Sequence, residues 1–237
     1  IYMIESPVFS IDCVINKEAE IVGNLPVLIS VPHDGRRTTI GHQYICPLPG
    51  GIPADKNVRF LARDICSRVK DSTTGIPSLV VDEIQRSRRW ATSSLFSDYV
   101  HHRVAQISEE FENASPKPPL VLDLHGFVNQ PPFGDYDLII GTAHRRSIQS
   151  DVDVQFGQFM SGRGYSIYLP NEVPVNGELF AADSARTLTR QVSTEFPHVD
   201  CMQVEIFRDY RTIEGRERGI QLAHDMGDFI IEYVSNY

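Results

Sequence analysis

Two histidines and two carboxylates in this sequence have the types and the placement that a catalytic metal site requires. His33 and His125 each come just after a short apolar run. Asp55 opens a stretch with helical periodicity, and Glu205 lies inside a third apolar run. The runs predict buried strands, and the functional residues of α/β sheets gather at the carboxyl ends of the strands. We therefore expect the four side chains to meet at one edge of a sheet.

These four residues predict a zinc hydrolase site. Zinc in hydrolases commonly takes three nitrogen or oxygen ligands and leaves one position for water, whose pKa falls to about 7. We assign His33, Asp55 and His125 as ligands of one Zn²⁺ ion, and Glu205 as the general base and later the acid. Each histidine also has an ordinary interpretation as a hydrogen-bonded structural residue, and Asp55 as the N-cap of its helix. Glu205 is more informative, because a carboxylate inside an apolar strand is costly unless it is paired or metal-bound.

Two further residues are candidates for roles beside the metal. Asp123 alternates with His125 along one predicted strand, so both lie on one face. Asp123 either orients the histidine from behind or is simply a buried, hydrogen-bonded carboxylate. His102 lies in a predicted helix, where it is either a catalytic hydrogen-bond donor or a polar residue of the helix surface.

Arginines near two strand ends are candidates for substrate contacts. Arg86 and Arg88 follow a predicted strand, and their planar guanidinium groups would grip a dicarboxylate. A solvated basic turn explains them equally well. Of the two arginines that follow Glu205, we expect Arg208 rather than Arg211 to polarise the substrate carbonyl or to hold a substrate carboxylate.

Apolar strands that alternate with amphipathic helices must position these residues. The predicted strands are Leu25–Val31, Ser78–Ile84, Leu120–Leu124, Tyr136–Gly141, Tyr165–Leu169 and Met202–Phe207. The predicted helices are Asp55–Lys70, Thr92–Glu112, Ile148–Gly162, a helix capped by Asp183 that ends near Glu195, and Glu214–Val234. Strands that are apolar on both faces belong inside a sheet covered by helices, so the pattern predicts an α/β fold.

Composition excludes several classes of protein. The chain of 237 residues is 41% hydrophobic and 22% charged, which is typical of a globular protein and fits one domain, 1–237. Its formal charge of −9 repels a phosphate backbone, and no apolar run is long enough to span a bilayer, so we expect neither nucleic acid nor membrane as a partner. The four cysteines are far apart, which favours reduced thiols in a cytoplasmic protein, with Cys66 as a packing residue.

Three common enzyme motifs are missing from the sequence. There is no G-x-S-x-G elbow of an α/β-hydrolase and no phosphate-binding G-x-x-x-x-G-K-[ST] loop. The third residue after His33 is Arg36, where the H-x-x-E motif of carboxypeptidase-like zinc enzymes requires a glutamate.

Several short motifs together resemble the N-formylglutamate amidohydrolase family over about residues 25–230. In chain order they are Pro32-His33-Asp34-Gly35, the helix opening at Asp55, Tyr99-x-x-His102, Leu122-Asp123-Leu124-His125, Ile140-Gly141-Thr142 and Gln203-Val204-Glu205-Ile206. The resemblance implies a phosphorylase/hydrolase-like three-layer sandwich with a mixed, mostly parallel central sheet. It also implies a zinc-dependent amidohydrolase that cleaves the C–N bond of an N-acyl amino acid such as N-formylglutamate. The chain is more distantly similar to N-acetylmuramoyl-L-alanine amidases, whose pattern supports Asp55 as the middle ligand and Glu205 as the base.

Two alternatives stay open, and a departure from the family pattern motivates the first. Where the family usually has an Asp-x-Asn-Arg run after the second strand, this chain has Trp90-Ala91-Thr92-Ser93, or the region near Asp82–Arg86 if the alignment shifts. The first alternative is a non-catalytic protein that binds an acidic ligand through Arg86, Arg88 and Arg208. The second is a zinc peptidase or cell-wall amidase, which changes the substrate but keeps the mechanism.

Overall fold

The computed structural model describes 21–32, 55, 57–82, 94–111, 115, 117–128, 133, 135–170 and 180–235, with the backbone alone at 94–95. It also gives the backbone of a short antiparallel pair, Thr39–Ile40 (β2) and Gln43–Tyr44 (β3). The predicted ligand His33 and the predicted substrate residues Arg86 and Arg88 lie outside the described residues.

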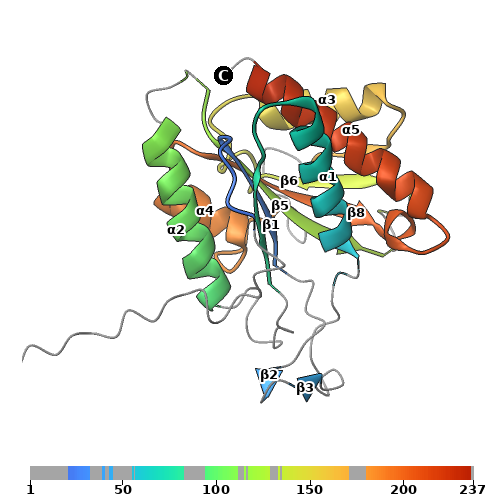
Figure 1. Ribbon diagram of the computed structural model, residues 1–237, viewed down its shortest axis with the longest axis horizontal. Coiled ribbons are helices and arrows are strands. Elements are labelled where there is room, and N and C mark those ends of the chain that lie inside the picture. Colours follow the sequence, from blue (N-terminus) through green and yellow to red (C-terminus); the bar gives the residue numbers. More distant parts are fainter. Residues whose placement is uncertain are drawn as a thin grey trace, which may run out of the picture.

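The centre of the fold is a sheet with the strand order β4-β1-β5-β8-β6-β7 (Figure 1). The strands are Val27–Val31 (β1), Ser78–Val81 (β4), Leu120–Phe127 (β5), Leu138–Gly141 (β6), Ile167–Tyr168 (β7) and Asp200–Phe207 (β8). β4, β1, β5 and β8 are mutually parallel, whereas β6 pairs antiparallel with β8 and parallel with β7. The prediction of a mixed, mostly parallel sheet is confirmed.

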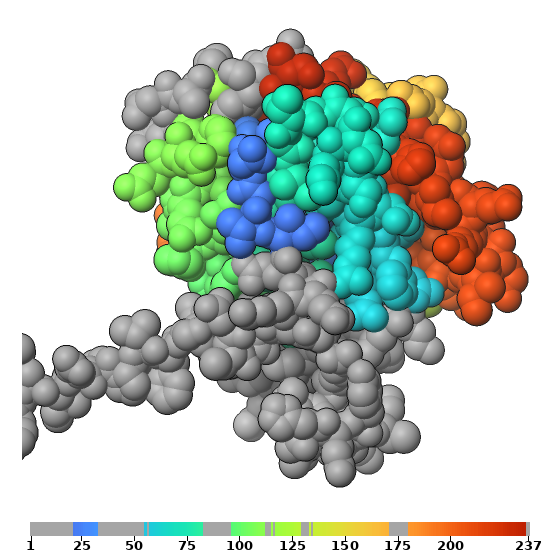
Figure 2. All heavy atoms as spheres, viewed as in Figure 1, coloured from blue at the N-terminus to red at the C-terminus, as the bar shows by residue number. Residues whose placement is uncertain are grey.

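Helices cover both faces of this sheet, which confirms the three-layer α/β architecture (Figure 1). Val58–Ser72 (α1), Val152–Gly162 (α3) and Arg216–Ser235 (α5) pack on one face. Ser94–Phe111 (α2) and Leu188–Glu195 (α4) pack on the other. α1 and α5 lie side by side, as the teal and red-orange surfaces of Figure 2 show. A short 3₁₀ turn, Arg208–Arg211 (η3), joins β8 to the segment before α5.

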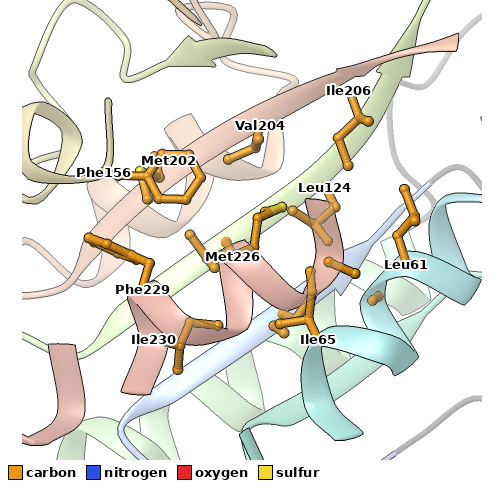
Figure 3. Packing of buried hydrophobic residues seen from close by; sticks show 14 of the residues in the cluster. Leu61, Ile65, Leu124, Phe156, Met202, Val204, Ile206, Met226, Phe229 and Ile230 are labelled. Atoms are coloured by element: carbon orange, nitrogen blue, oxygen red, sulfur yellow. The ribbon is translucent and has the colours of Figure 1, made fainter. Parts of the chain in front are cut away.

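The two faces of the central strands differ in character, because neighbouring residues of a strand point to opposite sides. On the side of α1 and α5 the side chains are apolar along the full strands, as in Leu120, Leu122 and Leu124 of β5, and Figure 3 shows this core. On the side of α2 and α4 the strands begin apolar, with Val121 in β5 and Cys201 in β8. They become polar toward their carboxyl ends, so the sheet has one structural face and one face with a polar end.

Two predicted helix starts need correction. α1 begins at Val58 and its N-cap is Asn57, so Asp55 is not the cap that the sequence allowed it to be. α4 is capped by Thr187, whose hydroxyl accepts a hydrogen bond from the backbone N–H of Arg190, and not by Asp183. Among the described helices, none combines the length and the apolar character of a membrane span.

Candidate active site

His125 and Glu205 face each other on the two central strands of the sheet. They are register partners in the parallel β5–β8 pair, and both lie near the carboxyl ends of their strands. Their side chains are buried, with 8% of His125 and 5% of Glu205 exposed. The sheet itself therefore places the predicted histidine ligand beside the predicted base.

Asp55 reaches the same point from the segment before α1. Its Oδ2 atom lies 3.6 Å from Nδ1 of His125, and its side chain is 14% exposed. The carboxylate does not cap α1, so it is available for a role at the strand ends. Three of the four residues predicted to form the metal site thus come together, and the fourth, His33, lies outside the described residues.

Asp123 stands behind the histidine, as its alternation with His125 predicts. Its Oδ2 atom lies 3.1 Å from Nε2 of His125. Its Oδ1 atom accepts a hydrogen bond of 2.7 Å from the Ser30 hydroxyl, and Thr189 of α4 donates to Oδ2 at 3.4 Å. Asp123 is fully buried, so these contacts fix the carboxylate, and the carboxylate in turn orients the imidazole ring.

Electrostatics in this cluster shift two pKa values. Burial raises the pKa of Glu205 to about 7, an effect that His125 opposes and that the carboxylates of Asp55 and Asp123 increase. Burial alone would lower the pKa of His125, but Asp123, Asp55 and Glu205 together raise it well above 6.5. Three carboxyl groups around one imidazole favour a bound cation, and a carboxyl group with a pKa near 7 is suited to both accept and donate a proton.

Two site residues were missed by the sequence analysis. Gln203 donates a hydrogen bond of 2.8 Å from Nε2 to Oε1 of Glu205, and its position two residues earlier on the same strand was the available signal. Arg211, which is 7% exposed, reaches the ends of β5 and β8, where Arg208 had been expected. Burial lowers the pKa of Arg211, while the carboxylates of Asp55 and Glu205 raise it, so its guanidinium lies within their electrostatic reach.

Two predicted residues are not brought to this cluster. The Arg208 side chain is 62% exposed, and its Nε atom lies 3.9 Å from Asp209. His102 is exposed on α2, where its Nε2 atom lies 3.1 Å from the side-chain nitrogen of Gln106. The 3₁₀ turn after β8 explains the first error, because it directs Arg208 outward and returns Arg211 to the strand ends.

The separation of two described donor atoms is compatible with their sharing one metal ion. Two ligands about 2.0–2.2 Å from zinc at a tetrahedral angle lie about 3.4 Å apart. The observed 3.6 Å between Nδ1 of His125 and Oδ2 of Asp55 is close to that value, and Asp123 holds the opposite ring nitrogen. Within the described part of the chain, no three His, Cys, Asp or Glu side chains form a metal site, so a complete site needs a further ligand such as His33.

A cavity of about 510 Å³ lies beside α1 and the segment that runs from η3 into α5. Asn57, Phe60, Arg211 and Arg216 are among the residues that line it, and the described part of its lining includes neither His125 nor Glu205. Among the described residues that line it, Arg211 and Asn57 connect this cavity to the strand ends.

Comparisons with solved structures support this fold. The chain is similar to N-formylglutamate amidohydrolase from Ralstonia eutropha JMP134, with a TM-score of 0.60 and 15% identity over 89% of this chain and 94% of that one. It is also similar to a gene product of Agrobacterium tumefaciens, with a TM-score of 0.57 and 14% identity over 93% and 99% of the two chains. An N-acetylmuramoyl-L-alanine amidase from Clostridium difficile 630 gives a TM-score of 0.40 and 12% identity over 89% and 95%. No protein-family model and no curated protein matches the sequence.

Proposed function

We propose that this protein is a zinc-dependent amidohydrolase that cleaves the C–N bond of an N-acyl amino acid of the N-formylglutamate type. One observation carries the proposal: the carboxyl ends of β5 and β8 bury His125 beside Glu205, with Asp55 3.6 Å from the imidazole. The fold shared with an N-formylglutamate amidohydrolase supports the same reaction class.

His33, Asp55 and His125 would hold the zinc ion, with Asp123 orienting His125. A bound zinc ion polarises a carbonyl group and lowers the pKa of a coordinated water to about 7. Glu205 accepts the proton that the water loses and later donates it to the leaving amine, since its pKa of about 7 allows both steps near neutral pH. Gln203 holds Oε1 of Glu205, which fixes the orientation of the carboxyl group during these transfers.

The proposed substrate is a small anionic molecule. Guanidinium groups bind carboxylates with two parallel hydrogen bonds, so arginine contacts suit such a substrate. Arg86 and Arg88 remain proposed substrate contacts on the evidence of the sequence. We also place the protein in the cytoplasm, because the described cysteines, Cys66 and Cys201, are free and buried.

The test is metal content together with hydrolysis of a panel of N-acyl amino acids. We expect about one zinc per chain by elemental mass spectrometry, and loss of that zinc in His125→Ala. Glu205→Gln should keep the metal but lose about 10²- to 10⁴-fold in turnover, the usual contribution of a general acid–base. His198→Ala changes an exposed histidine in the turn before β8 and serves as the matched control.

Two results would contradict the proposal. Near-full activity of Glu205→Gln would show that the base is assigned wrongly. Absence of metal from the parent protein, even after incubation with zinc, would favour the non-catalytic alternative, in which the arginines bind an acidic ligand without hydrolysing it. Hydrolysis of a cell-wall peptide, with no hydrolysis of N-acyl amino acids, would keep the mechanism and change the substrate.

A further inference from the structure

Arg211 connects the three chain segments that carry the site residues. Its Nε atom donates a hydrogen bond of 3.1 Å to the carbonyl oxygen of Ile206, the residue after Glu205. Its Nη2 atom donates a hydrogen bond of 3.0 Å to the carbonyl oxygen of Phe127, two residues after His125. One buried guanidinium group therefore ties together the ends of β5 and β8, immediately beyond the His125–Glu205 pair.

The glycine at position 126 makes this arrangement possible. A Cβ atom on Gly126 would lie 2.3 Å from Cζ of Arg211 and 2.5 Å from its Nη1 atom. Any larger residue between His125 and Phe127 would displace the guanidinium from the strand. A glycine inside a strand often marks such a close approach.

The third segment is joined through Asn57. Its Nδ2 atom donates a short hydrogen bond to the backbone carbonyl of Arg211. Asn57 has a left-handed backbone, with φ of 70°, and its side chain makes no capping hydrogen bond to α1. The helix therefore lacks a capping hydrogen bond that is usually worth about 1 kcal/mol. The Asn57 side chain instead binds the turn after β8, and so holds the segment that carries Asp55 against that turn.

We propose that Arg211 is a positioning residue, which together with Asn57 sets the separation between the Asp55 carboxylate and the His125 imidazole and so determines metal affinity. This inference rests on the proposed function. The two hydrogen bonds described for the Arg211 guanidinium go to main-chain carbonyl groups at the ends of β5 and β8. We therefore assign Arg211 to holding these strand ends in position.

The test compares the zinc affinity of the purified full chain, measured by competition with a chromophoric chelator, with its thermal stability. Asn57→Gly is the cleaner variant, because glycine adopts the left-handed conformation without strain and only the amide is lost. We expect the affinity for zinc to fall about 10- to 100-fold, as is usual when a supporting contact of a metal ligand is removed. The zinc affinity of Arg211→Met should fall at least as far. That of Arg211→Lys should lie between the affinities of Arg211→Met and the parent, because a lysine lacks the planar guanidinium that reaches both carbonyl groups.

Arg103→Met is the matched control for loss of a buried arginine. Arg103 is 8% exposed and donates to Ser78 Oγ and to the carbonyl oxygen of Gly23, in a network on α2. We expect this variant to lose stability and to keep the parent affinity for zinc. The inference is overturned if Asn57→Gly and Arg211→Met bind zinc within twofold of the parent, or if Arg103→Met loses as much affinity as they do. A parent protein that binds no zinc would instead overturn the proposed function, so the two failures are distinguishable.

Discussion

Glu205→Gln is expected to stabilise the metal-free protein at alkaline pH, although it lowers turnover. Burial raises the pKa of this carboxyl group from 4.5 to about 7 in the folded protein. The folded state then binds more protons than the unfolded state between these two values, so the free energy of unfolding falls as the pH rises through this window. Ionised Glu205 therefore opposes folding above pH 7 and has no such effect below about pH 4.5.

The magnitude follows from the two pKa values. A difference of one pKa unit corresponds to about 1.36 kcal/mol, so the ionised carboxylate costs at most about 3 kcal/mol above pH 7. Glutamine has nearly the same shape, carries no charge and still accepts the hydrogen bond from Gln203. The gain will be smaller than this limit, because Glu205 also supports the charged form of His125.

The assay is urea denaturation of chelator-treated protein at pH 5 and pH 8. We expect the variant and the parent to unfold with similar free energies at pH 5, and the variant to be about 1–3 kcal/mol more stable at pH 8. Glu110→Gln, an exposed position on α2, should shift the free energy of unfolding equally at both pH values. A variant that is no more stable than the parent at pH 8 would refute the reasoning, because Glu205 would then not be a buried carboxylate that ionises at a cost.

Two further outcomes follow from the contacts of the site. Asp123→Asn should weaken zinc binding about 10- to 100-fold, measured by chelator competition, because an amide orients the His125 ring less well than a carboxylate; unchanged affinity would contradict that role. Gly126→Ala should destabilise the protein by about 1–3 kcal/mol in urea denaturation, because the new methyl group collides with Arg211.

The position of polar residues at strand ends and the alternation of side chains predicted which residues the fold brings together. His125, Asp123 and Glu205 were predicted because each interrupts an apolar run at a place where a parallel sheet gathers its functional groups. The role of Asp55 could not be decided from sequence, since an acidic residue at a helix start is an equally good cap. The left-handed Asn57, which moves the start of α1 to Val58, excludes the cap, and the role of Asp55 as a ligand stays a prediction.

The choice between Arg208 and Arg211 depended on local backbone geometry. An extended chain after Phe207 would place Arg208 nearest to the strand ends, and Arg208 was the arginine that the sequence analysis preferred. The 3₁₀ turn reverses that order, and short turns of this kind leave little periodic signal in a sequence. Gly126 was the usable clue, because a glycine inside the apolar strand β5 indicates that another group approaches its backbone.

The location of the polar residues argues for function over stability. Ser30, Asp123 and Gln203 are register neighbours on β1, β5 and β8, the strands in the middle of the sheet, and they are buried. Polar groups in such places gain little over apolar side chains of the same shape, because their hydrogen bonds mainly replace those lost from water. On the opposite face of the same strands the buried side chains are apolar and form the main core, so the fold does not require polar residues there. The polar side chains beside α4 are therefore best explained by what they support, the orientation of His125 and Glu205, and substitutions there should affect metal binding more than folding.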